Sequence, residues 1–387
     1  MPGVTPRGSG RRVAALLALA GALAALTVAA QKKDKEQQTQ ILELPKDLPG
    51  SVVGETRRLS FYVTPLSSKG LLSQQVRDAL KALSRESGDT VLHIRAFVAG
   101  TGDLRRVRDL ISEIYTDRRQ PLPALSLVQA GGFGKEGAQV VLEAVVAGRK
   151  EVNPHGLAFL SAPVAATANP LDPVLPLAAK SLEGLGEALQ AADLTAGDVL
   201  RLTCYFTALD DLMAARRLVE AGYPGAAVDY VQTQRIPTQA AAGCEAVARL
   251  RSDPGQGFRA LDSASLVHEA GLSAGTLVGA PRLLFTGTQV SFGYQEQDGR
   301  LAFDRLRKEL AQAETTPQDV VVAHFYPLSM GIANQVRKLE AGFFDAARLP
   351  AGSLLLFEGL PSLDAGFAVD VVAAKREATA PAGAEVK

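Results

Sequence analysis

The sequence predicts an α+β protein built from three tandem copies of one small domain, and three observations lead to this fold class. Residues 90–104, TVLHIRAFVAGTGDL, align without a gap with residues 198–212, DVLRLTCYFTALDDL, at a spacing of 108 residues. A third, looser copy begins at Asp319 as DVVVAHFYPLS. Each copy lies within the same order of strand-like and helix-like segments, and such self-similarity indicates repeated structural units.

The first elements of each copy follow from the spacing of apolar residues. A strand is expected at 59–63, 157–160 and 283–286. Apolar residues then recur every three or four positions, which predicts a helix. This helix is expected at 72–84, 176–192 and 303–313. The repeated segment is the central strand, and a second helix is expected at 104–116, 212–221 and 332–344.

Each copy is expected to end in two further strands. They lie at 124–129 with 140–146, 227–232 with 244–250, and 353–357 with 367–373. The last strand carries an acid before small apolar residues each time, at Glu143, Glu245 and Asp370. Two helices on one face of a sheet leave its other face in need of cover. We therefore expect the three units to pack on one another.

The N-terminal segment predicts export. Arg7, Arg11 and Arg12 precede an apolar or small-residue run over 13–30, and Val28-Ala29-Ala30 offers small residues where a signal peptidase cuts. The expected location is periplasmic or extracellular, without stable membrane contact after cleavage. The alternative is an uncleaved anchor helix, because the run nearly reaches membrane length.

The domain boundaries follow from the repeats and from changes in composition. They are a signal peptide at 1–30, a linker at 31–56, repeats at 57–150, 155–250 and 272–375, a linker at 251–271 and a disordered tail at 376–387.

The composition excludes several classes of function. Lys+Arg and Asp+Glu both number 41, so no net charge attracts nucleic acid or an anionic membrane. Aromatic residues make up 5% and Trp is absent, which leaves little for stacking on exposed bases. The four histidines lack a second ligand at metal-binding spacing, so we expect no metal site and no cofactor. An oxidising compartment would permit a disulfide between Cys204 and Cys244, and two separate buried thiols fit equally well.

Two segments resemble the RidA/YjgF family, also called the L-PSP endoribonuclease family. Residues 188–209, ALQAADLTAGDVLRLTCYFTAL, resemble the family's helix, acid-Val turn and central strand, and residues 285–289, FTGTQ, resemble its Phe-x-Ser-Gly-Gln strand. The resemblance implies a chorismate-mutase-like fold in each repeat. Family members are typically homotrimers with ligand sites in the clefts between subunits. The resemblance therefore implies that the three repeats form an intramolecular pseudo-trimer, so that the chain could be monomeric. The clefts between the repeats would then bind a small metabolite.

The family's catalytic motifs are altered in all three repeats. Active members hydrolyse amino-acid-derived enamines and imines with an Arg in a Pro-Ala-Arg-Ser/Thr motif and an acid early in the last strand. The corresponding motifs here are Pro123-Ala124-Leu125-Ser126, Pro224-Gly225-Ala226-Ala227 and Pro350-Ala351-Gly352-Ser353. The acid position falls on Val141, Gly243 and Ala368. We therefore assign no catalytic residue.

Four polar positions remain as candidate substrate-binding residues. Ser161 and Asn334 match polar residues of the family, and Arg108 and Arg216 occupy the Asn position in the other repeats. The competing interpretation is a solvated helix surface for the arginines and ordinary strand or cap hydrogen bonds for the others. The first functional hypothesis is a binding protein with degenerate motifs. The alternative is a 2-iminobutanoate/2-iminopropanoate deaminase with a rearranged pocket that uses Arg108, Arg216 or Arg235.

Overall fold

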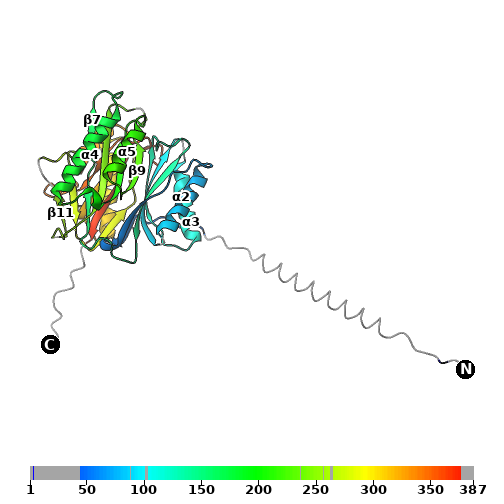
Figure 1. The fold of residues 1–387 in the computed structure, drawn as a ribbon. Coiled ribbons are helices and arrows are strands. Elements are labelled where there is room, and N and C mark those ends of the chain that lie inside the picture. Colours follow the sequence, from blue (N-terminus) through cyan, green and yellow to red (C-terminus); the bar gives the residue numbers. More distant parts are fainter. Residues whose placement is uncertain are drawn as a thin grey trace, which may run out of the picture. The chain divides into compact units, whose positions relative to one another are not determined.

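The computed structural model describes residues 3, 44–87, 89–100, 103–235, 237–255, 257–261 and 265–375. The described residues from Pro45 onward belong to one compact unit (Figure 1). The expected signal peptide, apart from Gly3, and the expected tail lie outside the described residues. No helix in the described part is both long and apolar enough to cross a membrane.

The described strands form three sheets, of which the first, sheet 1, has the order β2-β5-β3-β4. Its strands are β2 (Leu59–Val63), β3 (Thr90–Ala99), β4 (Ala124–Ala130) and β5 (Val140–Ala147). The strands β3 and β4 are parallel, and the other pairs are antiparallel. Helices α2 (Leu72–Ser87) and α3 (Leu104–Asp117) share a buried apolar cluster with one face of this sheet. Asp103 begins α3 by accepting hydrogen bonds from the first-turn amides of Arg105 and Arg106.

Sheet 2 has the order β11-β12-β6-β10-β8-β9, and β7 also pairs with β10. The strands are β6 (Leu157–Leu160), β7 (Ala165–Thr167), β8 (Val199–Phe206), β9 (Ala227–Gln232), β10 (Ala240–Arg249), β11 (Phe258–Leu261) and β12 (Gly275–Val278). Helices α4 (Val174–Ala191) and α5 (Leu212–Gly222) pack on one face.

Sheet 3 has the order β1-β13-β17-β15-β16, and β14 also pairs with β17. The strands are β1 (Ser51–Glu55), β13 (Arg282–Thr286), β14 (Gln289–Phe292), β15 (Val320–Phe325), β16 (Ala351–Leu354) and β17 (Ala365–Lys375). Helices α6 (Glu296–Gln312) and α7 (Met330–Glu340) cover one face.

Each sheet and its two helices contain the elements in the order that the sequence predicts. This order is a strand, a helix, a second strand, a second helix and a final pair of strands. Five strands were not predicted, of which β7, β12 and β14 lie within the expected repeats, β1 in the segment 31–56 and β11 in the segment 251–271. The strand β1 pairs antiparallel with β13, and β11 pairs antiparallel with β12. Both segments satisfy the backbone groups of a strand that would otherwise form a sheet edge.

The faces of the three sheets opposite their helices share two buried apolar clusters. The first cluster includes Phe61 and Val145 of sheet 1, Phe159 and Val247 of sheet 2, and Phe285 and Val372 of sheet 3. The second contains Phe97, Tyr205, Tyr326 and Phe357, whose rings meet with centroids 5.3 to 6.2 Å apart. The three sheets therefore cover one another's apolar faces.

The two cysteines are joined in a disulfide across neighbouring strands. Cys204 on β8 lies directly opposite Cys244 on β10 in the antiparallel ladder, with their Cα atoms 4.1 Å apart. Both belong to the cluster on the helix-covered face of sheet 2. Of the two interpretations that the sequence left open, the structure has the paired one.

Glu340, the last residue of α7, is a buried carboxyl that predicts a pH-dependent stability. It is 1% exposed, neither oxygen has a hydrogen-bond partner, and its carboxyl packs against Gly271. Burial, with a smaller contribution from Glu269, raises its pKa from 4.5 to about 8. The folded protein thus keeps a proton that the unfolded chain releases, and the free energy of unfolding falls as pH rises between these two values.

Replacing this carboxyl by a neutral isostere is expected to remove the loss of stability at high pH. Glu340→Gln should raise the free energy of unfolding at pH 7.5, by at most about 4 kcal/mol, and change it little at pH 4. Urea denaturation of both proteins at the two pH values measures the difference. Equal effects at pH 4 and pH 7.5 would contradict the assignment of a protonated Glu340.

Candidate functional site

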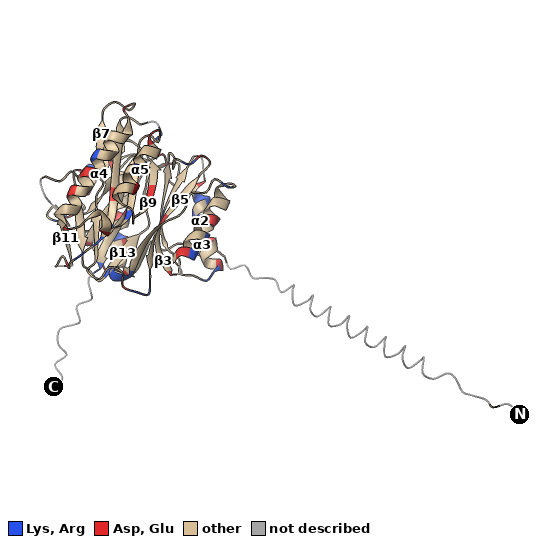
Figure 2. Cartoon of the chain, viewed as in Figure 1, with Lys and Arg blue, Asp and Glu red and all other residues tan. Residues whose placement is uncertain are grey.

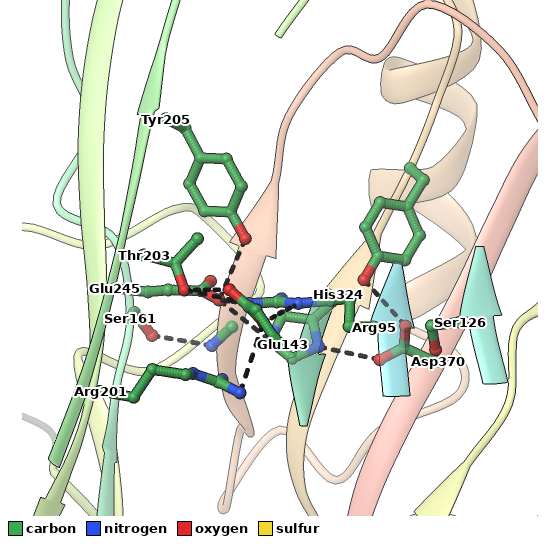
Figure 3. A network of polar contacts seen from close by, with 12 residues as sticks. Arg95, Ser126, Glu143, Ser161, Arg201, Thr203, Tyr205, Glu245, His324 and Asp370 are labelled. Atoms are coloured by element: carbon green, nitrogen blue, oxygen red, sulfur yellow. Dashed lines mark hydrogen bonds and ion pairs between the residues drawn. The ribbon is translucent and has the colours of Figure 1, made fainter. Parts of the chain in front are cut away.

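A buried polar network lies where the three sheets meet (Figure 3). Arg95 on β3 connects sheets 1 and 2, because its Nε is 2.6 Å from Glu143 Oε2 and its Nη2 is 2.6 Å from Glu245 Oε1. Arg201 on β8 adds a second cation, with Nη1 3.3 Å from Glu143 Oε2. The hydroxyl of Thr203 donates to Glu143.

Sheet 3 completes the network through His324 and Asp370. The ring Nδ1 of His324 lies 2.8 Å from Asp370 Oδ1, and its Nε2 lies 3.5 Å from Glu245 Oε1. Tyr326 donates to Asp370 at 2.8 Å, and Tyr205 donates to Glu245 at 3.1 Å. Ionisable groups from all three sheets therefore meet in one interior site.

The network is built from equivalent positions of the three sheets. In each ladder a central-strand residue pairs with the last-strand acid, as Arg95 with Glu143, Thr203 with Glu245, and His324 with Asp370. The neighbouring parallel strand contributes Ser126, Asp229 and Ser353 at the same level. The acids that the sequence singled out in the last strands thus belong to a common centre, whereas their partners were not predicted.

The charges of this centre are set by burial and by close partners. Burial alone would raise the pKa of Glu143, but Arg201 and Arg95 lower it to about 2. Burial would likewise raise the pKa of Asp370, but His324 lowers it to about 2. Burial lowers the pKa of His93 to about 4, so this ring is neutral at pH 7. For His324, burial opposes the charge, yet Glu245 and Asp370 raise the pKa above its usual value.

The centre is too small to be an active site. Its cavity, lined by His93, Arg95, Arg201, Glu245 and His324, has a volume of about 30 Å³. Such a space holds one or two water molecules and no metabolite. Among the described residues, no group of three or more His, Cys, Asp or Glu side chains could hold a metal ion. We interpret the network as the polar core that joins the sheets.

Three larger hollows lie at the seams between the sheets, and each receives residues from two of them, whereas a fourth, of about 500 Å³, lies against sheet 1 alone. The 1–3 cleft, of about 550 Å³, contains Leu125 on β4 and Gln289 on β14. The 1–2 cleft, of about 620 Å³, contains Val141 on β5 and Val228 on β9. The 2–3 cleft, of about 90 Å³, contains Gly243 on β10 and Leu354 on β16.

The four predicted binding residues are distributed over these seams and do not meet. Arg108 is exposed on α3 and lines the 1–3 cleft. Arg216 on α5 lines the 1–2 cleft, with its Cζ 5.1 Å from the centre of the Tyr230 ring. Asn334 is exposed on α7, and its carbonyl oxygen accepts a hydrogen bond from Arg337, which lines the 2–3 cleft.

Ser161 is buried at the seam between sheets 2 and 3. Its hydroxyl donates to the carbonyl oxygen of Ser273 at 2.5 Å and accepts from the amide of Gly352 at 2.9 Å. Both of these partners are backbone groups of the protein itself. Arg235, which the deaminase alternative invoked, has its Nε 3.2 Å from Glu358 Oε1.

The strand ladders show which residues lie at equivalent positions beside the three central strands. Leu125, Val228 and Gly352 pair with Ile94, Leu202 and Ala323. The sequence comparison had placed the second of these positions at Ala226, and the ladder places it two residues further along the chain. None of the three residues carries a guanidinium.

The 1–2 cleft differs from the other two in the state of its polar groups. Arg216 Nε, Tyr230 Oη and both carboxylate oxygens of Asp229 are buried without a hydrogen-bond partner. No described residue lining the 1–3 or 2–3 cleft has such an atom. An unpaired buried polar group costs about 1–3 kcal/mol. A ligand that pairs with these groups would recover part of that energy.

No protein-family model matches the chain, and no curated protein matches it. Solved structures match parts of it. A Rid-family protein of unknown function from Yersinia pestis is 18% identical with a TM-score of 0.30, over 31% of this chain and 100% of that chain. A YjgF-family protein from Neisseria meningitidis is 18% identical with a TM-score of 0.24, over 31% and 97% of the two chains.

A third solved structure is a member of the YjgF/YER057c/UK114 family from Mycobacterium tuberculosis. It is 23% identical with a TM-score of 0.23, over 27% of this chain and 87% of that chain. The similarity is to Rid and YjgF structures. In each case it concerns about a third of this chain.

Proposed function

We propose that the chain is a single-chain pseudo-trimer of three RidA-like units that binds a small anionic ligand in the 1–2 cleft. The repeated element order and the shared inner clusters support the assembly. The unpaired Arg216 Nε and Tyr230 Oη in the 1–2 cleft carry the proposal for binding. An obligate trimer of chains in sedimentation would contradict the single-chain assembly.

The guanidinium of Arg216 favours an anion. Stacking against Tyr230 orients its guanidinium, and a fixed guanidinium fork matches carboxylate or phosphate oxygens. Lys135 adds a second cation to the wall, and Glu86 and Glu220 balance these two cations, so the guanidinium and not the net charge of the wall is what would hold an anion. The expected ligand is therefore small and carries one compact anionic group.

The residues of the cleft support ligand binding but not imine hydrolysis. The position of the family's water-positioning acid is Val141, which lines this same cleft. A side chain without acid or base groups cannot activate a water molecule. We further propose that the chain is exported, a location supported by the Cys204–Cys244 disulfide, since disulfides persist in oxidising compartments.

Removing the guanidinium is expected to weaken binding. In titrations of the full chain with acetate, pyruvate and inorganic phosphate followed by NMR, Arg216→Met should weaken the best of these ligands at least about tenfold. Arg217→Met, on the exposed face of the same helix, is the control and should bind like the original protein. Unchanged affinity in Arg216→Met would contradict the proposal. Hydrolysis of amino-acid-derived imines that disappears in this variant would favour the deaminase alternative.

A further inference from the structure

We propose that His324 links sheet 3 to sheet 2 as a doubly protonated ring, and that loss of its proton at alkaline pH loosens the seam between these two sheets. The inference goes beyond the proposed function, because no ligand of the 1–2 cleft takes part in it. His324 lies on β15, and both nitrogens of its buried ring face carboxylate oxygens from two different strands.

The two ring nitrogens have different carboxylate neighbours (Figure 3). Nδ1 lies 2.8 Å from Asp370 Oδ1 within sheet 3, and Nε2 lies 3.5 Å from Glu245 Oε1 of sheet 2. An ionised carboxylate only accepts hydrogen bonds, and a neutral imidazole has only one nitrogen that can donate. A neutral ring would therefore point the lone pair of one nitrogen at a carboxylate. Only the imidazolium ion donates to both Asp370 and Glu245.

Each of the two carboxyl groups has another donor that favours its ionised form. Glu245 Oε1 accepts a hydrogen bond from Arg95 Nη2 at 2.6 Å, and Asp370 Oδ2 accepts one from the hydroxyl of Tyr326 at 2.8 Å. Hydrogen bonds donated to a carboxylate stabilise its charged form. Among the described residues, no arginine or lysine forms an ion pair with Asp370, so the imidazolium of His324 supplies its counter-charge.

The other charged groups around the ring do not remove this preference. The titratable and charged groups that face the ring from the surrounding strands are Asp370 on β17, Glu245 on β10, Arg95 and His93 on β3, Arg201 on β8 and Tyr326 on β15. Burial disfavours the charged ring and Arg95 repels it, yet Glu245 and Asp370 raise the pKa of His324 above its ordinary value of 6.5. Because burial keeps His93 neutral at pH 7, this ring adds no positive charge.

This arrangement makes the seam between sheets 2 and 3 sensitive to pH in one direction. The folded chain holds the proton of His324 more tightly than the unfolded chain, in which the ordinary value of 6.5 applies. The contribution of His324 to stability is therefore complete below pH 6.5 and is lost as pH rises through the higher folded value. Above that value a neutral ring faces Glu245, and the ionic link between the two sheets is gone.

Backbone amides that cross the seams report where the fold opens. The amide of Gly352 on β16 donates to Ser161 at 2.9 Å across the seam between sheets 2 and 3. Since β16 pairs with β15, which carries His324, opening of this seam exposes the Gly352 amide to solvent. The amide of Gly131 donates to the carbonyl oxygen of Gln232 at 2.8 Å between sheets 1 and 2, and it is the matched control.

Hydrogen exchange is compared at pH 6 and pH 9 in the Glu340→Gln chain, because this background removes the pH dependence of another buried carboxyl. After correction for intrinsic rates, protection of the Gly352 amide should fall at least about threefold, and that of Gly131 should stay within about twofold. Adding His324→Gln should remove the fall, whereas His155→Gln, at an exposed histidine, should leave it. Unchanged protection of Gly352, equal falls at both amides, or a fall that survives His324→Gln would overturn the inference.

The protonation of the ring is measured separately in the original chain through its ¹⁵N shifts. At pH 6 both nitrogens of His324 are expected to carry a proton, and an unprotonated nitrogen at this pH would overturn the inference. This measurement needs no variant, so it decides the proposal even if His324→Gln does not fold. Neither experiment involves a ligand, so the proposed function of the 1–2 cleft is tested independently.

Discussion

Arg95→Met is expected to lower the free energy of unfolding by about 3–5 kcal/mol, because it removes one partner of a buried ion pair. The side chain of Arg95 is 2% exposed, and its guanidinium lies 2.6 Å from carboxylate oxygens of both Glu143 and Glu245. Methionine replaces the aliphatic stem of the arginine but leaves the two carboxylates with less compensating charge. Denaturant unfolding of the purified variant measures the loss.

An exposed arginine with the same contact distance provides the matched control. Arg300 Nη2 lies 2.6 Å from Glu296 Oε1, with both side chains more than 40% exposed. Surface pairs of this kind contribute at most about 1 kcal/mol, so Arg300→Met should be nearly neutral. If Arg95→Met were as mild as the control, the network would not be the polar core that joins the sheets.

Removing the disulfide is expected to have the second largest effect. The bond joins residues with a sequence separation of 40. Closing a loop of that size restricts the unfolded chain by about 4 kcal/mol. Cys204→Ala/Cys244→Ala should therefore lower the free energy of unfolding by an amount of this order, and a reducing agent should destabilise the original chain in the same way.

The double variant also supplies the control for this second experiment. A reducing agent should leave its unfolding curve unchanged, since it has no bond to break. Two free thiols in the mass spectrum of the non-reduced original chain, together with insensitivity to the reducing agent, would contradict the pairing.

The elements of the fold could be predicted where the apolar pattern is strong. The strand at 59–63 and the strand at 227–232 were predicted with the bounds that the structure has. The start of α6 was missed, because its first turn is polar and is fixed by the backbone amide of Gln295 donating to Asp298 at 2.9 Å. Hydrophobic periodicity carries no signal for such a turn.

The centre of the molecule was only partly predictable. The three acids of the last strands stood out because they recur at equivalent positions. Their partners Arg95, Thr203 and His324 differ in type, so no shared residue marked the position. Alternation on the aligned central strands could have shown that these side chains point to the same face.

The candidate cleft combines a predicted residue with two that were missed. Arg216 was identified from its helix position, and it lines the cleft. Tyr230 and Asp229 gave no sequence signal, because each occupies an ordinary strand position. Their role depends on the seam between β9 and sheet 1, and contact between distant segments cannot be inferred from local patterns. Acidic and basic residues are interspersed along the described helices and strands (Figure 2), so overall charge did not mark the cleft either.

The most direct test of binding in the 1–2 cleft is a crystal structure of the chain grown with glycolate. The account predicts that the carboxylate of the bound glycolate lies within hydrogen-bonding distance of Arg216 Nε and Tyr230 Oη. Glycolate bound only at the 1–3 or 2–3 cleft would contradict it. So would an Arg216 Nε that is paired with a side chain of the protein in the ligand-free crystal.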